Sequence, residues 1–130
     1  MIFGIGTDIV AVKRMAEFWR RHGEHGLEKL LAPDERAECL ASKHPERFLA
    51  KRFAAKEALG KALGTGIRAP VLLTAIAVSH DDLGKPAFKL TPELNSYLKT
   101  RGLTTHLSLS DEQDYALAFV VLETTDGAPQ

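Results

Sequence analysis

Residues 47–63 read RFLAKRFAAKEALGKAL, and this stretch predicts one uninterrupted helix. Ala, Leu, Lys and Glu dominate it, and these four residue types favour helices. Pro45 suits the first turn of such a helix, and Gly64 suits its C-terminal end. We therefore expect a long central helix with the rest of the chain packed around it.

Two faces of this helix carry different side chains. The apolar residues that share one narrow stripe form the expected core face: Phe48, Ala55, Leu59 and Ala62. A second row, spaced four residues apart, holds Phe53, Glu57 and Lys61 and is flanked by alanines instead of long charged side chains. This row is either a Glu–Lys pair on a partly covered helix or the edge of a functional site.

The N-terminal segment Ile2–Val10 alternates in character, which predicts a strand. Its apolar side chains share one face, and its glycines and its acid share the other: Phe3, Ile5 and Ile9 against Gly4, Gly6 and Asp8. A face of small residues beside a carboxylate leaves room for another backbone or for a ligand. The alternative is a core strand that ends in a helix-capping Asp8.

The whole chain has the size and composition of one globular domain. Its 130 residues include 17 acidic and 17 basic side chains, so the net charge is zero and nothing indicates nucleic acid binding. The single cysteine, Cys39, excludes an internal disulfide and predicts a small buried side chain. We expect one domain over residues 1–123 and a flexible C-terminal tail over residues 124–130.

The N-terminus is apolar, but it lacks a basic leader and Asp8 interrupts it. The sequence therefore predicts neither a signal peptide nor a membrane span. We expect a cytoplasmic protein.

The next segment, Val12–Arg21, predicts a helix with a basic outer side. Four cations lie there against Glu17 alone: Lys13, Arg14, Arg20 and Arg21. Such a face is either simply solvated or a docking surface for an acidic partner.

The remaining segments alternate between short helices and strands. Glycines at 23 and 26 break the chain, and helical pieces follow at residues 27–32 and 33–42. Strands are expected at residues 73–79, 87–90, 105–110 and 115–123, with a turn at 81–86 and a helix from 91 to about 102. Gly64-Thr65-Gly66 is either a small anion-compatible loop or a helix exit. His106 is the one histidine on the polar face of a predicted strand.

Two motifs in this order resemble those of the 4′-phosphopantetheinyl transferases, specifically the short bacterial holo-acyl-carrier-protein synthase type. They are Gly6-Thr7-Asp8 and, some fifty residues later, Arg52-Phe53-Ala54-Ala55-Lys56-Glu57-Ala58 with Lys61-Ala62. The likeness continues through Gly64-Thr65-Gly66, Gly84-Lys85-Pro86 and His106-Leu107-Ser108-Leu109-Ser110, so it covers nearly the whole chain.

The resemblance implies a function and a fold. The activity is transfer of the 4′-phosphopantetheine arm of coenzyme A to a serine of apo acyl carrier protein, with adenosine 3′,5′-bisphosphate as by-product, in fatty acid biosynthesis. The fold is α+β, with helices packed on a mainly antiparallel sheet. The short members assemble as homotrimers with sites between protomers, so we expect a homotrimer and no membrane or nucleic acid partner.

The resemblance also assigns roles to residues of this chain. Asp8 and Glu57 match Mg²⁺ ligands, and together with Lys61, which holds a phosphate, they form the expected catalytic group. Coenzyme A binding is assigned to Arg52, Lys61, Gly64, Thr65 and His106, with Lys43, Arg47 or Lys56 assisting Arg52. Arg14 and Arg21 match the docking surface for the acidic carrier protein. The general base stays open between Glu57 and water or hydroxide on the metal.

Two positions depart from the pattern. Val10 stands where the larger transferase class often has a third acid, and Asp111 stands where relatives commonly have a second histidine. Two other functions compete with the transferase: a non-catalytic module that binds coenzyme A or an acidic protein, and a metal-dependent phosphohydrolase. An anion-binding module gains nothing from two carboxylates aimed at phosphates, since they repel the ligand unless a metal is present.

Overall fold

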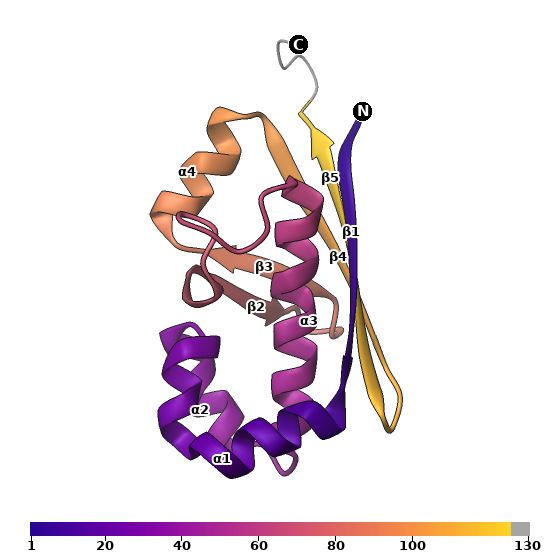
Figure 1. Cartoon of the computed structure of the whole chain (residues 1–130). Helices are drawn as coiled ribbons and strands as arrows, with labels where there is room; N and C mark the ends of the chain where they lie inside the picture. The colour runs from indigo at the N-terminus through magenta and orange to yellow at the C-terminus, as the bar shows by residue number, and fades with distance from the viewer. Residues whose placement is uncertain (126–130) are drawn as a thin grey trace.

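The computed structural model describes residues 1–125, in which helices pack on two small antiparallel sheets (Figure 1). The elements follow the order β1 (Ile2–Ala11), α1 (Val12–Leu30), α2 (Pro33–Ala41), α3 (Pro45–Leu63), η1 (Leu73–Ala75), β2 (Ile76–His80), β3 (Pro86–Leu90), α4 (Pro92–Thr100), β4 (Leu103–Asp111) and β5 (Tyr115–Thr124). The predicted α+β class is confirmed. Within residues 1–125, no helix is both long and apolar enough to cross a membrane.

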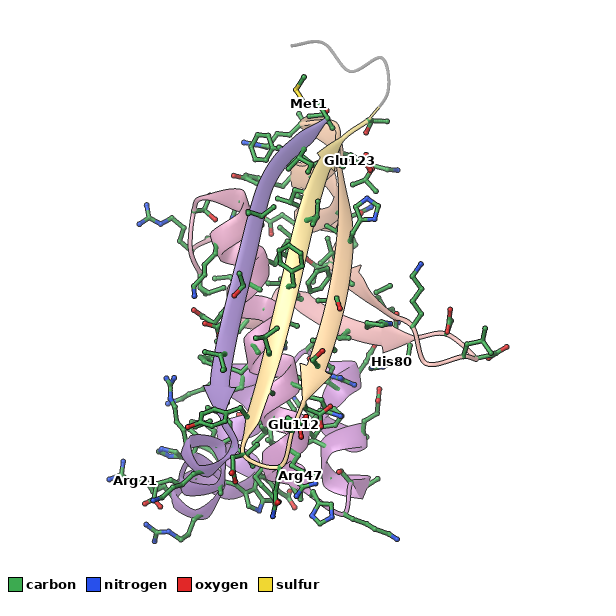
Figure 2. The ribbon with its side chains drawn as sticks, turned by 90° about the vertical axis from the view of Figure 1, so that its right-hand side faces the viewer. Met1, Arg21, Arg47, His80, Glu112 and Glu123 are labelled. Atoms are coloured by element: carbon green, nitrogen blue, oxygen red, sulfur yellow. The ribbon has the colours of Figure 1, made fainter. Side chains whose placement is uncertain are left out.

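The larger sheet joins the two ends of the chain. Its order is β1-β5-β4, and both pairings are antiparallel, so the N-terminal strand lies beside the last strand. Ile5 pairs with Val121, which in turn pairs with His106 on β4. The strands β2 and β3 form a separate hairpin (Figure 1). This hairpin projects from the side of the molecule in Figure 2.

Helix α3 lies along the inner face of the larger sheet and is buried on nearly every side (Figure 1). The predicted core residues Ala55 and Leu59 have no exposed surface, and neither do Ala50 and Ala54, which flank the second row. Phe48, which the sequence places in the core stripe, is only half-buried. Helix α3 is thus covered on more than one side, and the prediction of a single narrow core stripe is too narrow.

Close approach of α3 to β1 depends on two glycines. A Cβ at Gly4 would collide with the carbonyl oxygen of Ala62, and a Cβ at Gly6 would collide with that of Ala58. The small face of β1 thus accommodates another backbone, as the alternation of residues predicts. This contact sets the distance between the strand that carries Asp8 and the helix that carries Glu57.

The other face of the larger sheet is apolar and exposed. Figure 2 looks onto this outer face. The large apolar side chains on β1 and β5 that are at least 40% exposed include Phe3, Ile5, Ile9, Tyr115, Leu117 and Phe119. The alternation in β1 is therefore confirmed, but its apolar row faces outward and its glycine row faces the core. We call these six residues the outer sheet face.

Three boundaries differ from the sequence prediction. Helix α1 does not end at Arg21 but continues to Leu30 across Gly23, whose φ of 55° and ψ of −145° interrupt the helical backbone. The predicted strand at residues 73–79 begins with the short helix η1 before β2 starts at Ile76. The predicted tail loses Thr124 to β5, and Thr125 donates a backbone hydrogen bond to Gly102. The rest of that tail lies outside the described residues.

Candidate active site

Asp8 and Lys61 meet where β1 faces the C-terminal half of α3. The Lys61 ammonium donates hydrogen bonds to Asp8 Oδ1 at 3.0 Å and to the carbonyl oxygen of Thr7 at 2.9 Å. The Asp8 side chain is 16% exposed and the Lys61 side chain is 53% exposed. The pair therefore lies at the edge of the β1–α3 contact, where a solvent-borne ligand can reach both charges.

Glu57 lies one turn before Lys61 on the same face of α3. Burial raises the pKa of the Glu57 carboxyl above its ordinary value, and the negative charge of Asp8 raises it further. The cations Lys61 and Arg14 oppose this shift in the Glu57 pKa. The negative charge of Asp8 therefore acts on Glu57, and a pair of carboxylates in this relation favours a bound cation.

A hard cation such as Mg²⁺ fits this donor set. It prefers carboxylate and water oxygens, and it commonly takes one or two protein carboxylates together with oxygens of a substrate phosphate. Asp8 and Glu57 are the residues that would hold it. Within the described residues, no group of three or more metal-ligating side chains occurs. Val10, at the position where the larger transferase class often has a third acid, is 2% exposed and belongs to the hydrophobic core.

The Gly64–Gly66 loop closes α3. Gly64 adopts the left-handed conformation with φ of 78°. The amides of Gly64, Thr65 and Gly66 donate to carbonyl oxygens of the last helical turn, at Gly60 and Lys61, over 3.0 to 3.2 Å. These amides already have partners, so the local geometry is that of a helix exit. If Gly64 and Thr65 bind coenzyme A, they must do so through other atoms, or their amides must first leave these hydrogen bonds.

The side chains of Arg52 and Lys56 point away from the Asp8–Glu57–Lys61 group and form a buried ionic cluster with Glu35. The Lys56 ammonium is fully buried and donates to Glu35 Oε1 at 2.7 Å and to the carbonyl oxygens of Leu30 and Leu73. Arg52 is 4% exposed, its Nε lies 3.2 Å from Glu35 Oε2, and its guanidinium stacks over Phe48. Because Lys56 is fully buried and already bonded to three oxygens, it has no free position for a phosphate within this protomer.

The remaining predicted coenzyme A residue lies on the other side of the sheet. His106 is exposed on β4, and its Nε2 lies 2.9 Å from Glu123 Oε1 on β5. Asp8 faces α3 on the inner side, whereas His106 belongs to the outward row of its strand. Within a single chain the predicted catalytic and coenzyme A residues therefore divide into four places: the Asp8–Glu57–Lys61 group, the Gly64–Thr65 loop, the Arg52 cluster and His106.

The predicted docking residues line a hollow beside the middle of α3. Arg14, Arg21 and Phe53 border it, together with apolar side chains of α1, and its volume is about 440 Å³. Both arginines are exposed. Figure 2 shows Arg21 at the lower end of the molecule and Glu123 near the opposite end. The basic face of α1 and the outer-face His106–Glu123 pair are thus well separated.

Sequence reasoning missed Glu35, which organises the buried cluster. Its carboxylate also accepts hydrogen bonds from the amides of Ala32 and Val78, each at 3.0 Å. The Pro33-Asp34-Glu35 helix start gave a signal, because a glutamate at the third helical position often bonds back to the amide before the helix. Its pairing with Lys56 and Arg52 had no local signal.

Comparison with known proteins identifies the family. The model of the 4′-phosphopantetheinyl transferase superfamily matches residues 4–120. A holo-[acyl-carrier-protein] synthase of Dechloromonas aromatica is 58% identical over 123 residues, covering 95% of this chain and 98% of the relative. One of Azoarcus sp. is 56% identical over 124 residues, covering 95% and 99%.

The solved structures that resemble this fold are also holo-[acyl-carrier-protein] synthases. The crystal structure of holo-[acyl-carrier-protein] synthase from Neisseria meningitidis matches with a TM-score of 0.91 and 47% identity, covering 95% of this chain and 100% of that one. The Bacillus anthracis enzyme in complex with CoA (3′,5′-ADP) matches with a TM-score of 0.81 and 36% identity, covering 96% and 99%. The fold is that of a 4′-phosphopantetheinyl-transferase-like domain. The chain belongs to the 4′-phosphopantetheinyl transferase superfamily, and its relatives in it are holo-[acyl-carrier-protein] synthases.

Proposed function

We propose that this chain is a holo-acyl-carrier-protein synthase. It transfers the 4′-phosphopantetheine group of coenzyme A to a serine of apo acyl carrier protein and releases adenosine 3′,5′-bisphosphate, in the cytoplasm and for fatty acid biosynthesis. The observation that carries the proposal is the Asp8–Glu57–Lys61 group, in a chain that matches a relative of that name over 95% of its length.

The chain's own residues supply binding and orientation in this reaction. Lys61 binds a phosphate oxygen of coenzyme A as a compact point charge, once that oxygen replaces Asp8 as its partner. Asp8 and Glu57 would hold Mg²⁺. When bound, the metal neutralises negative charge on the pyrophosphate. Glu57 and water are the two candidates to accept the proton of the serine hydroxyl.

The carrier protein docks on the basic face of α1. Arg14 and Arg21 are exposed there, and they line a hollow that reaches the middle of α3 at Phe53, one turn before Glu57. Acyl carrier protein is acidic, so opposite charges favour this encounter. Arg20 contributes less, because it is paired with Glu17 on the same helix.

We further infer a homotrimer in which neighbouring protomers complete each site. The outer sheet face exposes six large apolar side chains on adjacent strands, and a second copy of this chain is the occupant we propose for it. Such packing also brings His106 of one protomer toward the acidic group of another. This arrangement accounts for the separation of His106 from Asp8 within a single protomer.

Product analysis separates this function from its alternatives. The chain is incubated with coenzyme A and Mg²⁺, with and without apo acyl carrier protein, and the nucleotide products are resolved by chromatography. The proposal predicts adenosine 3′,5′-bisphosphate only when the carrier protein is present. Release of free phosphopantetheine without carrier would instead identify a hydrolase. Binding of coenzyme A by calorimetry with no product in either reaction would identify a binding module.

A further inference from the structure

The guanidinium group of Arg14 packs against an aromatic ring. Its guanidinium carbon lies 5.3 Å from the centroid of the Phe53 ring on α3, within the range of a cation–π contact. Within residues 1–125, Arg14 forms no ion pair, whereas Arg20 on the same helix is paired with Glu17. The ring therefore orients Arg14 without neutralising its charge, which stays available to a partner.

The ring that supports Arg14 belongs to the helix of the acidic site. Phe53, Glu57 and Lys61 follow one another at four-residue intervals on α3, so successive members rise by about 6 Å along one face. The Arg14 guanidinium lies over the Phe53 ring, and Phe53 lies one helical turn before Glu57 on the same face of α3. Helix α3 thus fixes the separation between the ring that supports Arg14 and the proposed phosphate-binding Lys61.

We propose that Phe53 is a positioning residue: its ring fixes the Arg14 guanidinium beside the acidic site, so that a docked carrier protein arrives in register with Glu57 and Lys61. The inference rests on the docking role proposed above for Arg14. Arginine has many rotamers, and holding it in place before binding reduces the ordering cost of the complex. Phe53 therefore acts through Arg14 and touches no reacting atom.

A double-mutant cycle tests this coupling. The variants are Phe53→Leu, Arg14→Ala and the double substitution, and the measured quantity is the KM for apo acyl carrier protein at saturating coenzyme A. Leucine keeps an apolar side chain in the hollow but removes the π face. Loss of a cation–π contact at an exposed site should raise this KM by about two- to fivefold. The KM for coenzyme A should not change, and in the Arg14→Ala background Phe53→Leu should add almost nothing.

Phe53→Tyr is the matched control, because it retains the ring, and it should keep the KM for carrier protein near that of the wild type. The NMR signals of the Arg14 side chain give an independent readout: the ring-current shift should be lost in Phe53→Leu and retained in Phe53→Tyr. Additive effects of Phe53→Leu and Arg14→Ala would overturn the proposal, as would equal increases in both KM values. An unchanged KM in Arg14→Ala would overturn the docking role as well, so the two failures are distinguishable.

Discussion

At the scale of single residues, the ionised Glu57 side chain lowers the stability of the folded protein. Glu57 is partly buried beside Asp8, and both burial and the neighbouring charge raise the pKa of Glu57. A group with a raised pKa binds protons more readily in the folded than in the unfolded chain. Ionised Glu57 therefore destabilises the protein, which is typical of groups placed for function and not for stability.

Replacing Glu57 by glutamine should stabilise the protein near neutral pH. Glutamine has the shape of the protonated acid and no charge. Solvent screens the partly buried Glu57 charge, so the gain in unfolding free energy near pH 7 should be below about 1 kcal/mol. It should shrink as the pH falls through the raised pKa of Glu57 and vanish below its ordinary value of 4.5, because the wild-type carboxyl is then protonated in both states.

Urea titrations of both proteins at a series of pH values give this difference directly. The same Glu57→Gln protein should be inactive in transfer. A loss of stability near pH 7 would contradict the account, because it would mean that Glu57 forms a stabilising ion pair instead of a strained acidic site.

At the level of elements, the orientation of α3 is determined on two sides. On one side the glycines of β1 contact its backbone, and on the other the Lys56 ammonium is bonded to α2, to the end of α1 and to η1. Lys56 and Glu57 are adjacent, so their side chains diverge by about 100° around the helix. Fixing Lys56 therefore fixes the direction in which Glu57 points.

Glu35→Gln should strongly destabilise the fold. The substitution removes the buried negative charge that balances Lys56 and Arg52, and burial already lowers the pKa of both cations. Breaking a buried ion pair of this kind typically costs about 3–5 kcal/mol. Urea denaturation measures the loss. The control is Asp34→Asn on the same helix, which removes an exposed pair with Lys89 and should leave the melting temperature unchanged. Equal stability of Glu35→Gln and wild type would refute the role of the cluster.

Gly6→Ala should separate β1 from α3. The added methyl group meets the carbonyl oxygen of Ala58, which belongs to helical backbone and cannot move freely. Overpacking of this kind costs about 1–3 kcal/mol. Thermal unfolding measures it, with Thr7→Ala on the exposed face as the control. A melting temperature equal to that of the wild type would show that the strand–helix contact is looser than described.

Local patterns explain which elements the sequence predicts well. The span of α3 and the alternation of β1 are properties of neighbouring residues, so composition and period suffice. The continuation of α1 beyond Gly23 was not predictable, because packing of Gly26 against Phe18 supports the second segment. Burial of Lys56 was not predictable either, since its carboxylate partner lies 21 residues away. The Asp8–Lys61 contact spans 53 residues and was accessible only through the family resemblance.

At the level of the whole molecule, the outer sheet face is the surface through which we propose that copies of this chain assemble. Ile5 is 58% exposed in this face and lies across β5 from His106. The alternation of β1 predicted that these side chains share a face, but not that the face is outward. A single sequence contains no local signal for what covers such a face, because the covering surface in our proposal comes from a second copy.

Ile5→Lys should therefore dissociate the proposed trimer. A buried lysine in an apolar interface carries an unpaired charge, which strongly disfavours association. Sedimentation equilibrium should show a folded monomer, and transfer activity should fall because each site needs two protomers. The control is Leu83→Lys in the hairpin turn, where the side chain is 96% exposed, and this variant should remain trimeric. A monomeric wild-type protein with full activity would contradict the assembly.

The most direct test of the account is a mass spectrum of apo acyl carrier protein after incubation with this chain, coenzyme A and Mg²⁺. Parallel reactions contain a chelator or the Asp8→Ala protein, which loses one carboxylate at the edge of the site but no core residue. The account predicts a mass gain of one phosphopantetheine group in the complete reaction and none in the other two, with Asp8→Ala still folded. An unmodified carrier protein in the complete reaction, with the chain folded and coenzyme A bound, would contradict it.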